Sequence, residues 1–258
     1  MEKFLLDNQK TAEKISNFLK QEFKKRNKAV AVIGLSGGID STVTSLLCKK
    51  AGLDLCGVLL PYRKKGLEES KKVAQFLELP KDRVFIVDIA PAVDAQIKEL
   101  QKRIILDRAD KGNIMARQRM IVQYALARRL NGLVMGTENL SEYYLGYFTL
   151  HGDQASDISA IASLFKTQVY DLGKYLGAPP WVLERKPTAG LWKGQTDEGE
   201  FGFTYRDADQ ILYSRFVLNY SKDKLISKQG LAPKVIEKVL ARVKATEYKR
   251  QEPPKCDL

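Results

Sequence analysis

Short apolar runs alternate with longer amphipathic segments through the first half of the chain. Four runs of strand length, poor in charge and rich in aliphatic residues, span residues 29–33, 55–60, 84–88 and 133–136. Segments with apolar residues at helical spacing lie between them, at residues 42–50, 67–78, 91–106 and 113–129, and another precedes them at residues 8–26. Strands that alternate with helices predict a parallel sheet covered on both faces, with ligands bound beyond the carboxyl ends of the strands.

The second half of the chain is predicted to be mainly helical. A helix over residues 166–176 is stopped by a glycine and two prolines, and further helices are expected at about 206–219, 222–229 and 232–246. Residues 186–202 lack periodicity and predict a mobile loop with the length of a lid. No shift in composition marks a boundary, so we expect residues 1–258 to form one domain, an α/β fold with a helical C-terminal extension.

The composition is typical of a globular protein with enough residues for a full core. The chain has 258 residues, of which 44% are hydrophobic and 29% are charged. No apolar run approaches the ~20 residues of a membrane span, and the first residues lack the apolar core of a signal peptide. A cytoplasmic location without membrane contact is therefore expected. Three cysteines without metal-type spacing and a single histidine argue against thiolate or multi-histidine metal sites.

The charge balance is strongly basic. The chain carries 43 basic and 31 acidic residues, which gives a formal net charge of +12. Such an excess is compatible with RNA as a partner and equally with a polyphosphate or dinucleotide substrate. The basic residues are spread along the chain, and no basic tract interleaved with aromatic residues indicates a single-strand binder. Charge alone does not choose between these classes, although nucleic-acid binding is the weaker interpretation.

The most informative stretch is the glycine-rich turn between the first strand and the helix after it. Residues 34–41 read Gly-Leu-Ser-Gly-Gly-Ile-Asp-Ser. The glycines let the backbone turn sharply and direct several N–H groups at an anion, and the new helix adds its positive N-terminus. Asp40 places a carboxylate where a magnesium ion bridging triphosphate oxygens would bind. The stretch lacks the ending of the common P-loop, and its alternative interpretation is a plain turn in a βα unit.

Residues 36–41 resemble the pyrophosphatase loop of the ATP-pyrophosphatases, which cleave ATP into AMP and pyrophosphate. Further segments, in the same order, are similar to the NAD synthetase family over nearly the whole chain. They are residues 112–120, residues 136–142 with 146–149 and 152–153, residues 166–169, and residues 186–189 with 194–198. The resemblance implies an adenine-nucleotide hydrolase-like (Rossmann-like) fold, a homodimer, and the ATP-dependent amidation of deamido-NAD by ammonia to give NAD, AMP and pyrophosphate.

The resemblance also implies roles for individual positions. ATP is expected to contact the loop residues Gly34, Leu35, Ser36, Gly37, Gly38, Ile39, Asp40 and Ser41, together with Thr137, Lys166 and Thr188. Asp40 and Glu142 are expected to hold Mg2+ against the leaving phosphates, and Lys166 to stabilise charge on the α-phosphate. Deamido-NAD is expected to contact Arg117, Leu150, Asp157, Tyr248 and Lys249. Asp153 is the expected ammonium site, so Asp40, Lys166 and Asp153 form the catalytic set.

The resemblance favours ammonia as the direct nitrogen donor. Members of the family that use glutamine carry an additional amidase domain with a nucleophilic cysteine. Neither the length of this chain nor the surroundings of Cys48, Cys56 and Cys256 suit such a domain. We therefore expect free ammonia to be the substrate.

Three positions depart from the pattern of the family. Leu150 stands where a lysine is usual, Tyr248 where a histidine is usual, and Gly190 replaces a common aspartate. We expect these departures to change contacts with the dinucleotide rather than the activation of ATP.

The site residues also have alternative, purely structural interpretations. Arg117, Lys166 and Lys249 could be solvated surface side chains. Asp40, Glu142 and Asp157 could be helix caps or loop hydrogen-bond acceptors. Two rival functions remain: another adenylating enzyme with the same loop, RNA-modifying or GMP-synthetase-like, and a non-catalytic basic module that binds nucleotides or RNA.

Overall fold

A five-stranded parallel sheet forms the centre of the fold in the computed structural model, which describes residues 4–192 and 194–256. The strands are β1 (Val30–Gly34), β2 (Asp54–Leu59), β3 (Val84–Ile86), β4 (Gly132–Gly136) and β5 (Ile158–Ser159), in the order β3-β2-β1-β4-β5. All four pairings between neighbouring strands are parallel. The predicted parallel sheet is confirmed, but β5 was not predicted, because a strand of two residues carries no recognisable apolar run.

Helices surround the sheet and continue beyond it. The helices between and beside the strands are α1 (Asn8–Lys25), α2 (Ile39–Lys50), α3 (Leu67–Phe76), α4 (Ala90–Leu100), α5 (Arg108–Arg129), α6 (Leu140–Leu145), α7 (Lys166–Tyr175) and α8 (Pro180–Leu183). The sequence placed the end of α4 too late and the start of α5 too late. Asp107 explains the boundary, because its side chain accepts a hydrogen bond from the backbone N–H of Asp110 and the Asp110 side chain bonds back, which starts α5 as a capping box.

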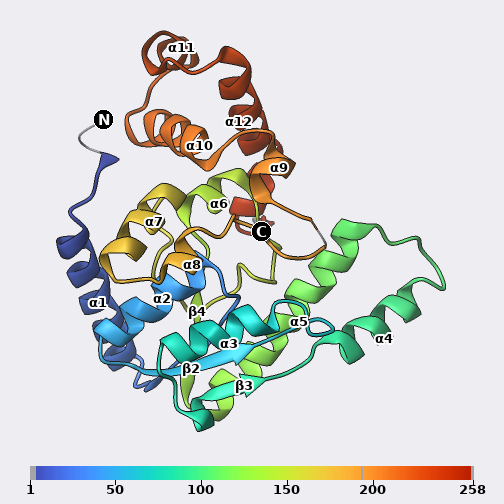
Figure 1. The fold of residues 1–258 in the computed structure, drawn as a ribbon. Coiled ribbons are helices and arrows are strands. Elements are labelled where there is room, and N and C mark those ends of the chain that lie inside the picture. Colours follow the sequence, from blue (N-terminus) through green and yellow to red (C-terminus); the bar gives the residue numbers. More distant parts are fainter. Residues whose placement is uncertain (1–3, 193, 257–258) are drawn as a thin grey trace.

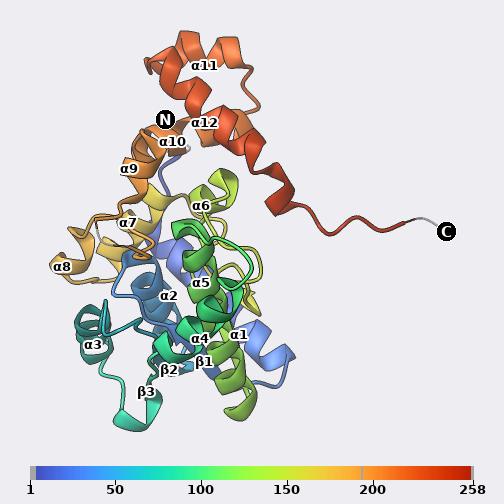
Figure 2. The ribbon, with the colours of Figure 1, turned by 90° about the vertical axis from the view of Figure 1, so that its right-hand side faces the viewer.

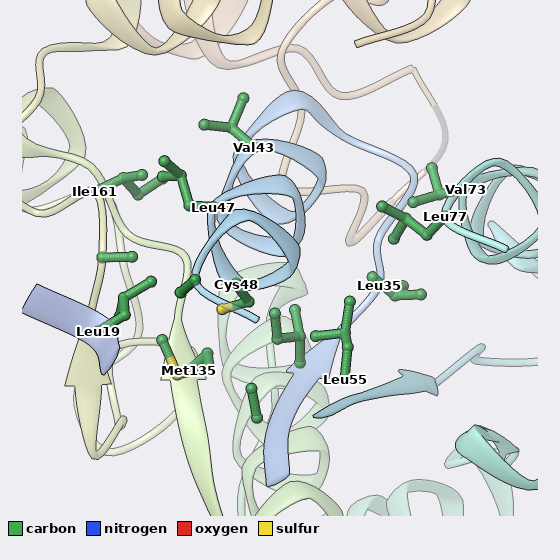
Figure 3. Packing of buried hydrophobic residues seen from close by; sticks show 14 of the residues in the cluster. Leu19, Leu35, Val43, Leu47, Cys48, Leu55, Val73, Leu77, Met135 and Ile161 are labelled. Atoms are coloured by element: carbon green, nitrogen blue, oxygen red, sulfur yellow. The ribbon is translucent and has the colours of Figure 1, made fainter. Parts of the chain in front are cut away.

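The two faces of the sheet pack against different helices. Alternate residues of a strand point to opposite faces, and accordingly Ala31 and Ile33 belong to one buried cluster while Val30 and Val32 belong to another. Apolar side chains of α1, α2, α3 and α7 complete the first cluster, and those of α4 and α5 complete the second. Figure 3 shows the first cluster around α2, where Val43, Leu47 and Cys48 face residues from the neighbouring helices and strands. The helix-covered sheet expected from the sequence is therefore confirmed.

A third apolar cluster holds together the helical C-terminal extension. It is built from α9 (Asp197–Phe201), α10 (Tyr205–Leu212), α11 (Lys222–Gln229) and α12 (Pro233–Ala245), and residues of α6 and Phe165 join it. The extension stands above α6 and α7 at one end of the molecule (Figure 1), and the chain leads away from it after α12 (Figure 2). In the described parts of the chain, no helix combines the length and apolar character needed to cross a membrane.

The strand order places two loops side by side. From β1 the chain moves outward through β2 to β3, whereas β4 lies on the other side of β1 and leads to β5. The direction of winding therefore reverses between β1 and β4. Ligands of open parallel sheets bind at such a switch point, beyond the carboxyl ends of the two strands. The loops that follow β1 and β4, residues 35–38 and 137–139, carry several of the predicted ATP contacts, and they lead into the first turns of α2 and α6, which carry the predicted metal ligands Asp40 and Glu142.

Candidate functional site

The glycine-rich turn after β1 folds back on itself through its two serines. Ser36 Oγ and Ser41 Oγ lie 3.1 Å apart, and Ser36 Oγ accepts a hydrogen bond from the N–H of Gly38 at 3.2 Å. Gly37 has a φ of +77°, and a Cβ at this position would lie 2.7 Å from Glu69 Cβ. A glycine is therefore required both by the backbone conformation and by the space available. The turn delivers the chain directly into α2, whose N-terminus faces the same place and favours an anion there.

The short helix α6 supplies the second part of the site. Asn139 begins it, because its Oδ1 accepts from the N–H of Glu142 at 3.0 Å and its own N–H donates to Glu142 Oε2 at 3.2 Å. The Nδ2 of Asn139 also donates to Asp40 Oδ1 at 2.9 Å, which joins the loop after β1 to the loop after β4. The capping interactions fix the Glu142 side chain and direct its second oxygen toward Asp40 and Lys166.

Lys166 brings the two predicted metal ligands together. Its Nζ lies 2.6 Å from Asp40 Oδ2 and 3.0 Å from Glu142 Oε1, and its side chain is 3% exposed. It comes from the first residue of α7, so three separate segments meet at one ammonium group. The solvated-lysine interpretation of Lys166 is wrong, because this side chain is buried between two carboxylates.

Two carboxyl groups share one ammonium at this point. Burial alone lowers the pKa of Lys166, but the carboxylates of Asp40 and Glu142 raise it above its usual value, so the lysine is protonated. Burial, with the nearby Asp40 charge, raises the pKa of Glu142 to about 8 although Lys166 opposes the shift. With this pKa Glu142 is largely protonated at neutral pH, so the Lys166 ammonium and the Asp40 carboxylate neutralise each other. A second cation at this point would favour the ionised form of Glu142 and displace its proton.

The predicted lid is folded onto the rest of the molecule over much of its length. Asp197 is buried, and its Oδ1 accepts from the N–H of Ala189 at 3.0 Å while its Oδ2 accepts from the Tyr205 hydroxyl at 3.1 Å. Helix α9 begins at Asp197, where the sequence predicted no regular structure. Thr188 lies in this segment and its Oγ1 accepts from the N–H of Gly190 at 3.0 Å, while Thr137 follows β4 at the carboxyl edge of the sheet.

Four of the predicted dinucleotide contacts form two pairs on either side of one loop. Arg117 Nε donates to the carbonyl oxygen of Leu150 at 3.2 Å, so these two positions adjoin. Lys249 Nζ donates to the carbonyl oxygens of Gly146 and Phe148 at 2.9 and 2.7 Å, while the neighbouring Tyr248 is 63% exposed. The two pairs therefore flank the same loop, residues 146–150.

Asp157 lies elsewhere. Its Oδ2 accepts from the N–H of Val134 at 2.8 Å, and it lines a surface cavity of about 920 Å³ together with Lys28 and Gly132. Lys28 precedes β1 and Gly132 begins β4, so this cavity is at the amino ends of the strands. The structure does not bring Asp157 to the cluster around Lys166.

Asp153, the expected ammonium site, belongs to the loop after α6. Its Oδ1 accepts from the N–H of Thr149 at 2.7 Å, and Thr149 Oγ1 in turn donates to Asn113 Oδ1 at 2.8 Å. The carboxylate interacts electrostatically with Arg119 and with Glu138. The loop thus holds Asp153 through its own backbone and through α5.

Two charged residues at the site were missed by sequence reasoning. Glu138 has a buried Oε1 without a hydrogen-bond partner in the described structure, and burial, with the charges of Glu142 and Asp153, raises its pKa to about 8. Arg185 Nη1 donates to the carbonyl oxygen of Ser36 at 3.4 Å, which places a guanidinium beside the phosphate turn. Glu138 was visible within a matching segment, and Arg185 immediately precedes another, so their positions next to the motifs were the available signal.

Comparisons with known proteins show the family and the fold. A protein-family model described as NAD synthase matches residues 11–253. The chain is 40% identical over 250 residues to the NH(3)-dependent NAD(+) synthetase of Pyrococcus furiosus, which covers 95% of each chain. A solved structure described as NMN synthetase from Francisella tularensis superposes with a TM-score of 0.86 at 32% identity, covering 98% of this chain and 100% of that one. An NH3-dependent NAD synthetase from Campylobacter jejuni, in complex with the nitrate ion, superposes with a TM-score of 0.80 at 29% identity, covering 98% and 100%.

Proposed function

The chain belongs to the NAD synthase family, and from that premise we propose how its residues carry out the reaction. It catalyses the ammonia-dependent conversion of deamido-NAD to NAD, with ATP as co-substrate, as predicted from the sequence. The observation that supports our assignment of the site is the buried cluster of Asp40, Glu142 and Lys166 next to the phosphate turn. The two rival functions lack comparable support, because the matching family covers most of the chain.

We propose that ATP binds across the carboxyl ends of β1 and β4. The turn of residues 34–41 would receive the β- and γ-phosphates at the N-terminus of α2, with Arg185 beside it. Thr137 and Thr188 would contact the rest of the nucleotide from the loop after β4 and from the segment held by Asp197. Lys166 would stabilise the negative charge that develops on the α-phosphate.

The donor set suits a magnesium ion. Asp40 and Glu142 present hard carboxylate oxygens, and the ammonium of Lys166 already shows that a cation is held between them. Within the described residues no group of three or more His, Cys, Asp or Glu side chains is arranged as a metal cage. Mg2+ is commonly bound by one or two carboxylates together with substrate phosphates, so two ligands suffice. When bound, the ion would neutralise charge on the leaving pyrophosphate.

The chemistry needs no covalent link to the protein. An oxygen of the nicotinate carboxylate attacks the α-phosphorus of ATP, and the bond to the β-phosphate oxygen breaks, which gives an acyl-adenylate and pyrophosphate. The nitrogen of ammonia then attacks the acyl carbon, the bond to the AMP oxygen breaks, and one proton is released as the amide forms. We propose that Asp153 and Glu138 bind the nitrogen donor at this end of the site, because the two carboxyl groups interact with each other and the buried Oε1 of Glu138 has no hydrogen-bond partner in the described structure.

A second substrate is favoured by one comparison. The Francisella tularensis structure is described as an NMN synthetase, and amidation of the nicotinate mononucleotide would be the equivalent reaction without the adenylate half. Leu150 stands next to Arg117 in the expected dinucleotide contact, where the family usually supplies a lysine. We propose that the mononucleotide is also accepted, because a missing charge at this position weakens the preference for the longer substrate.

We also infer a homodimer in the cytoplasm, as is usual for this family. Two exposed apolar side chains next to each other just before α5 support a partner surface: Ile105 is 98% exposed and Ile104 52%. Adjacent exposed apolar side chains often mark contacts between subunits. Sedimentation analysis of the wild type and of an Ile105→Lys variant would test this, and a monomeric wild type would contradict it.

The reaction is tested by product analysis. The purified chain is mixed with ATP, MgCl2, ammonium chloride and either deamido-NAD or the nicotinate mononucleotide. We expect the amidated product, AMP and pyrophosphate in equal amounts, and no product when ammonium is replaced by glutamine. Equal amounts of AMP and pyrophosphate without an amidated product would contradict the proposed acyl transfer. Absence of product from the mononucleotide alone would restrict the substrate to deamido-NAD.

A further inference from the structure

A buried carboxylate of the helical extension reaches the point where α6 and α7 begin. Asp209 lies on α10 and is 0% exposed. Its Oδ1 accepts a hydrogen bond from the hydroxyl of Ser141, in the first turn of α6. Its Oδ2 accepts from both the backbone N–H and the hydroxyl of Thr167, in the first turn of α7, at 2.8 Å each. One carboxylate therefore joins three helices.

These contacts lie one residue away from the proposed catalytic residue Lys166 and from the proposed metal ligand Glu142. Ser141 precedes Glu142, and Thr167 follows Lys166. The backbone N–H of Lys166 also donates to Ser141 Oγ at 2.8 Å, so the hydroxyl that donates to Asp209 accepts from the lysine. The carboxylate in addition complements the positive N-terminus of α7. The backbones that carry the ammonium and the Glu142 carboxylate are thus fixed by the same side chain.

A purely structural contact would not need a charge at this place. The extension already packs against α6 and Phe165 through an apolar cluster that includes Leu145, Ile211 and Leu212. Burial of a carboxylate is costly and has to be offset by hydrogen bonds. In this case burial raises the pKa of Asp209 to about 6, although Ser141 and Thr167 donate to it. A costly charge held beside an active site indicates a role in arranging that site.

We propose that Asp209 is a positioning residue, which sets the Lys166 ammonium and the Glu142 carboxylate at their working separation. The inference rests on the roles proposed above for Lys166 and Glu142. Small errors in the placement of catalytic groups are expensive: a shift of about 1 Å can reduce a rate about 100-fold. Asp209 also connects the site to the extension, since α10 follows the segment that carries Thr188. Sequence reasoning missed it because an aspartate on the apolar face of a helix has no motif.

The test compares substitutions of Asp209 and of one of its hydrogen-bond donors, Thr167. Asp209→Asn keeps the shape but offers one acceptor oxygen and turns an amide N–H2 toward hydrogen-bond donors. We expect kcat to fall about 10- to 100-fold while KM for ATP stays within about threefold, because the phosphate turn is untouched. Thr167→Val removes the hydroxyl and should lower kcat, whereas Thr167→Ser keeps the hydroxyl and should not. Ile211→Ala is the matched control, since Ile211 lies on the same helix and is also 0% exposed.

Several outcomes would overturn the proposal. A kcat for Asp209→Asn equal to that of Ile211→Ala, at temperatures where both are folded, would leave only a structural role. If Asp209→Asn does not fold, equal kcat values for Thr167→Val and Thr167→Ser would have the same meaning.

A crystal structure of Asp209→Asn provides a measure that does not depend on turnover. We expect Lys166 Nζ to lie outside hydrogen-bonding distance of at least one carboxylate, compared with 2.6 and 3.0 Å in the wild type, and unchanged distances would contradict the proposal. Failure of the proposed function would appear separately, as a wild type that forms no NAD.

Discussion

Replacing Lys166 by methionine would separate its role as a buried cation from its role in catalysis. Methionine keeps most of the length and apolar character of the side chain but leaves Asp40 and Glu142 facing each other without the ammonium that lies 2.6 and 3.0 Å from them. Removal of one partner from a buried ion pair typically costs about 3–5 kcal/mol. For a protein of this size each kcal/mol lowers the melting temperature by about 2–4 °C, so a fall of roughly 10 °C is expected.

A divalent cation should reverse this loss in the variant. In the wild type a metal ion must compete with the ammonium for the same oxygens, whereas in Lys166→Met it does not. A ligand present at about 100 times its dissociation constant stabilises the folded state by about 2.7 kcal/mol, which would restore more than half of the loss. The assay is thermal unfolding with and without MgCl2, together with Mn2+ binding followed by electron paramagnetic resonance in the absence of ATP.

The matched control is Lys174→Met, on the exposed side of the same helix. We expect Lys174→Met to unfold and to bind Mn2+ like the wild type, while Lys166→Met binds Mn2+ at least about tenfold more tightly, a difference of about 1.4 kcal/mol. Mn2+ affinity for Lys166→Met that is equal to or weaker than that of the wild type would refute the reasoning. In that case Asp40 and Glu142 would not form a cation site.

Three further predictions follow from the same contacts. Asp40→Asn and Glu142→Gln should each abolish most single-turnover release of pyrophosphate, and the double variant should lose little more, because the effects of substituting two ligands of one ion are not additive. Strictly additive losses of activity would argue against a shared ion. Leu150→Lys should lower KM for deamido-NAD and leave KM for ATP nearly unchanged at saturating ammonium and fixed ionic strength, and equal shifts in both constants would show that position 150 does not face the dinucleotide. The pKa of Asp209 is raised to about 6 in the folded protein and is near 3.9 in the unfolded chain. Between about pH 4 and pH 6 the unfolded chain has therefore lost this proton while the folded protein still holds it, so the contribution of Asp209 to stability falls as pH rises across this range. The unfolding free energy of the wild type relative to Asp209→Asn should therefore fall by about 3 kcal/mol across this range in denaturant titrations, and a rise would contradict the burial of this charge.

The sequence predicted the parts of the fold that depend on local pattern. The buried strands β1, β2 and β4 are continuous apolar runs, and the turn after β1 carries its own glycines, so both were recognisable without tertiary information. Strand β5 and helix α6 are too short to show a period, and they form because neighbouring elements pair with them or cap them. The magnesium role of Asp40 was already suggested by the glycine-rich turn, whereas the roles of Glu142 and Lys166 came from resemblance, and the structure brings these three side chains together. Their assignment as ATP and metal contacts stays a prediction, as do those of Arg117, Asp157 and Lys249.

The Glu142 carboxylate caps a helix and contacts the buried ammonium at the same time. Its carboxylate has two oxygens, and one accepts the N–H of Asn139 in a capping box while the other lies 3.0 Å from Lys166 Nζ. The cap restricts the rotation of the side chain, and this restriction leaves the second oxygen fixed toward the cation. Asn139 has the same double use, because one end of its side chain begins α6 and the other donates to Asp40. Substitution of Asn139 should therefore disturb the helix and the site together, since the same bonds that start α6 also set the spacing of the two carboxylates.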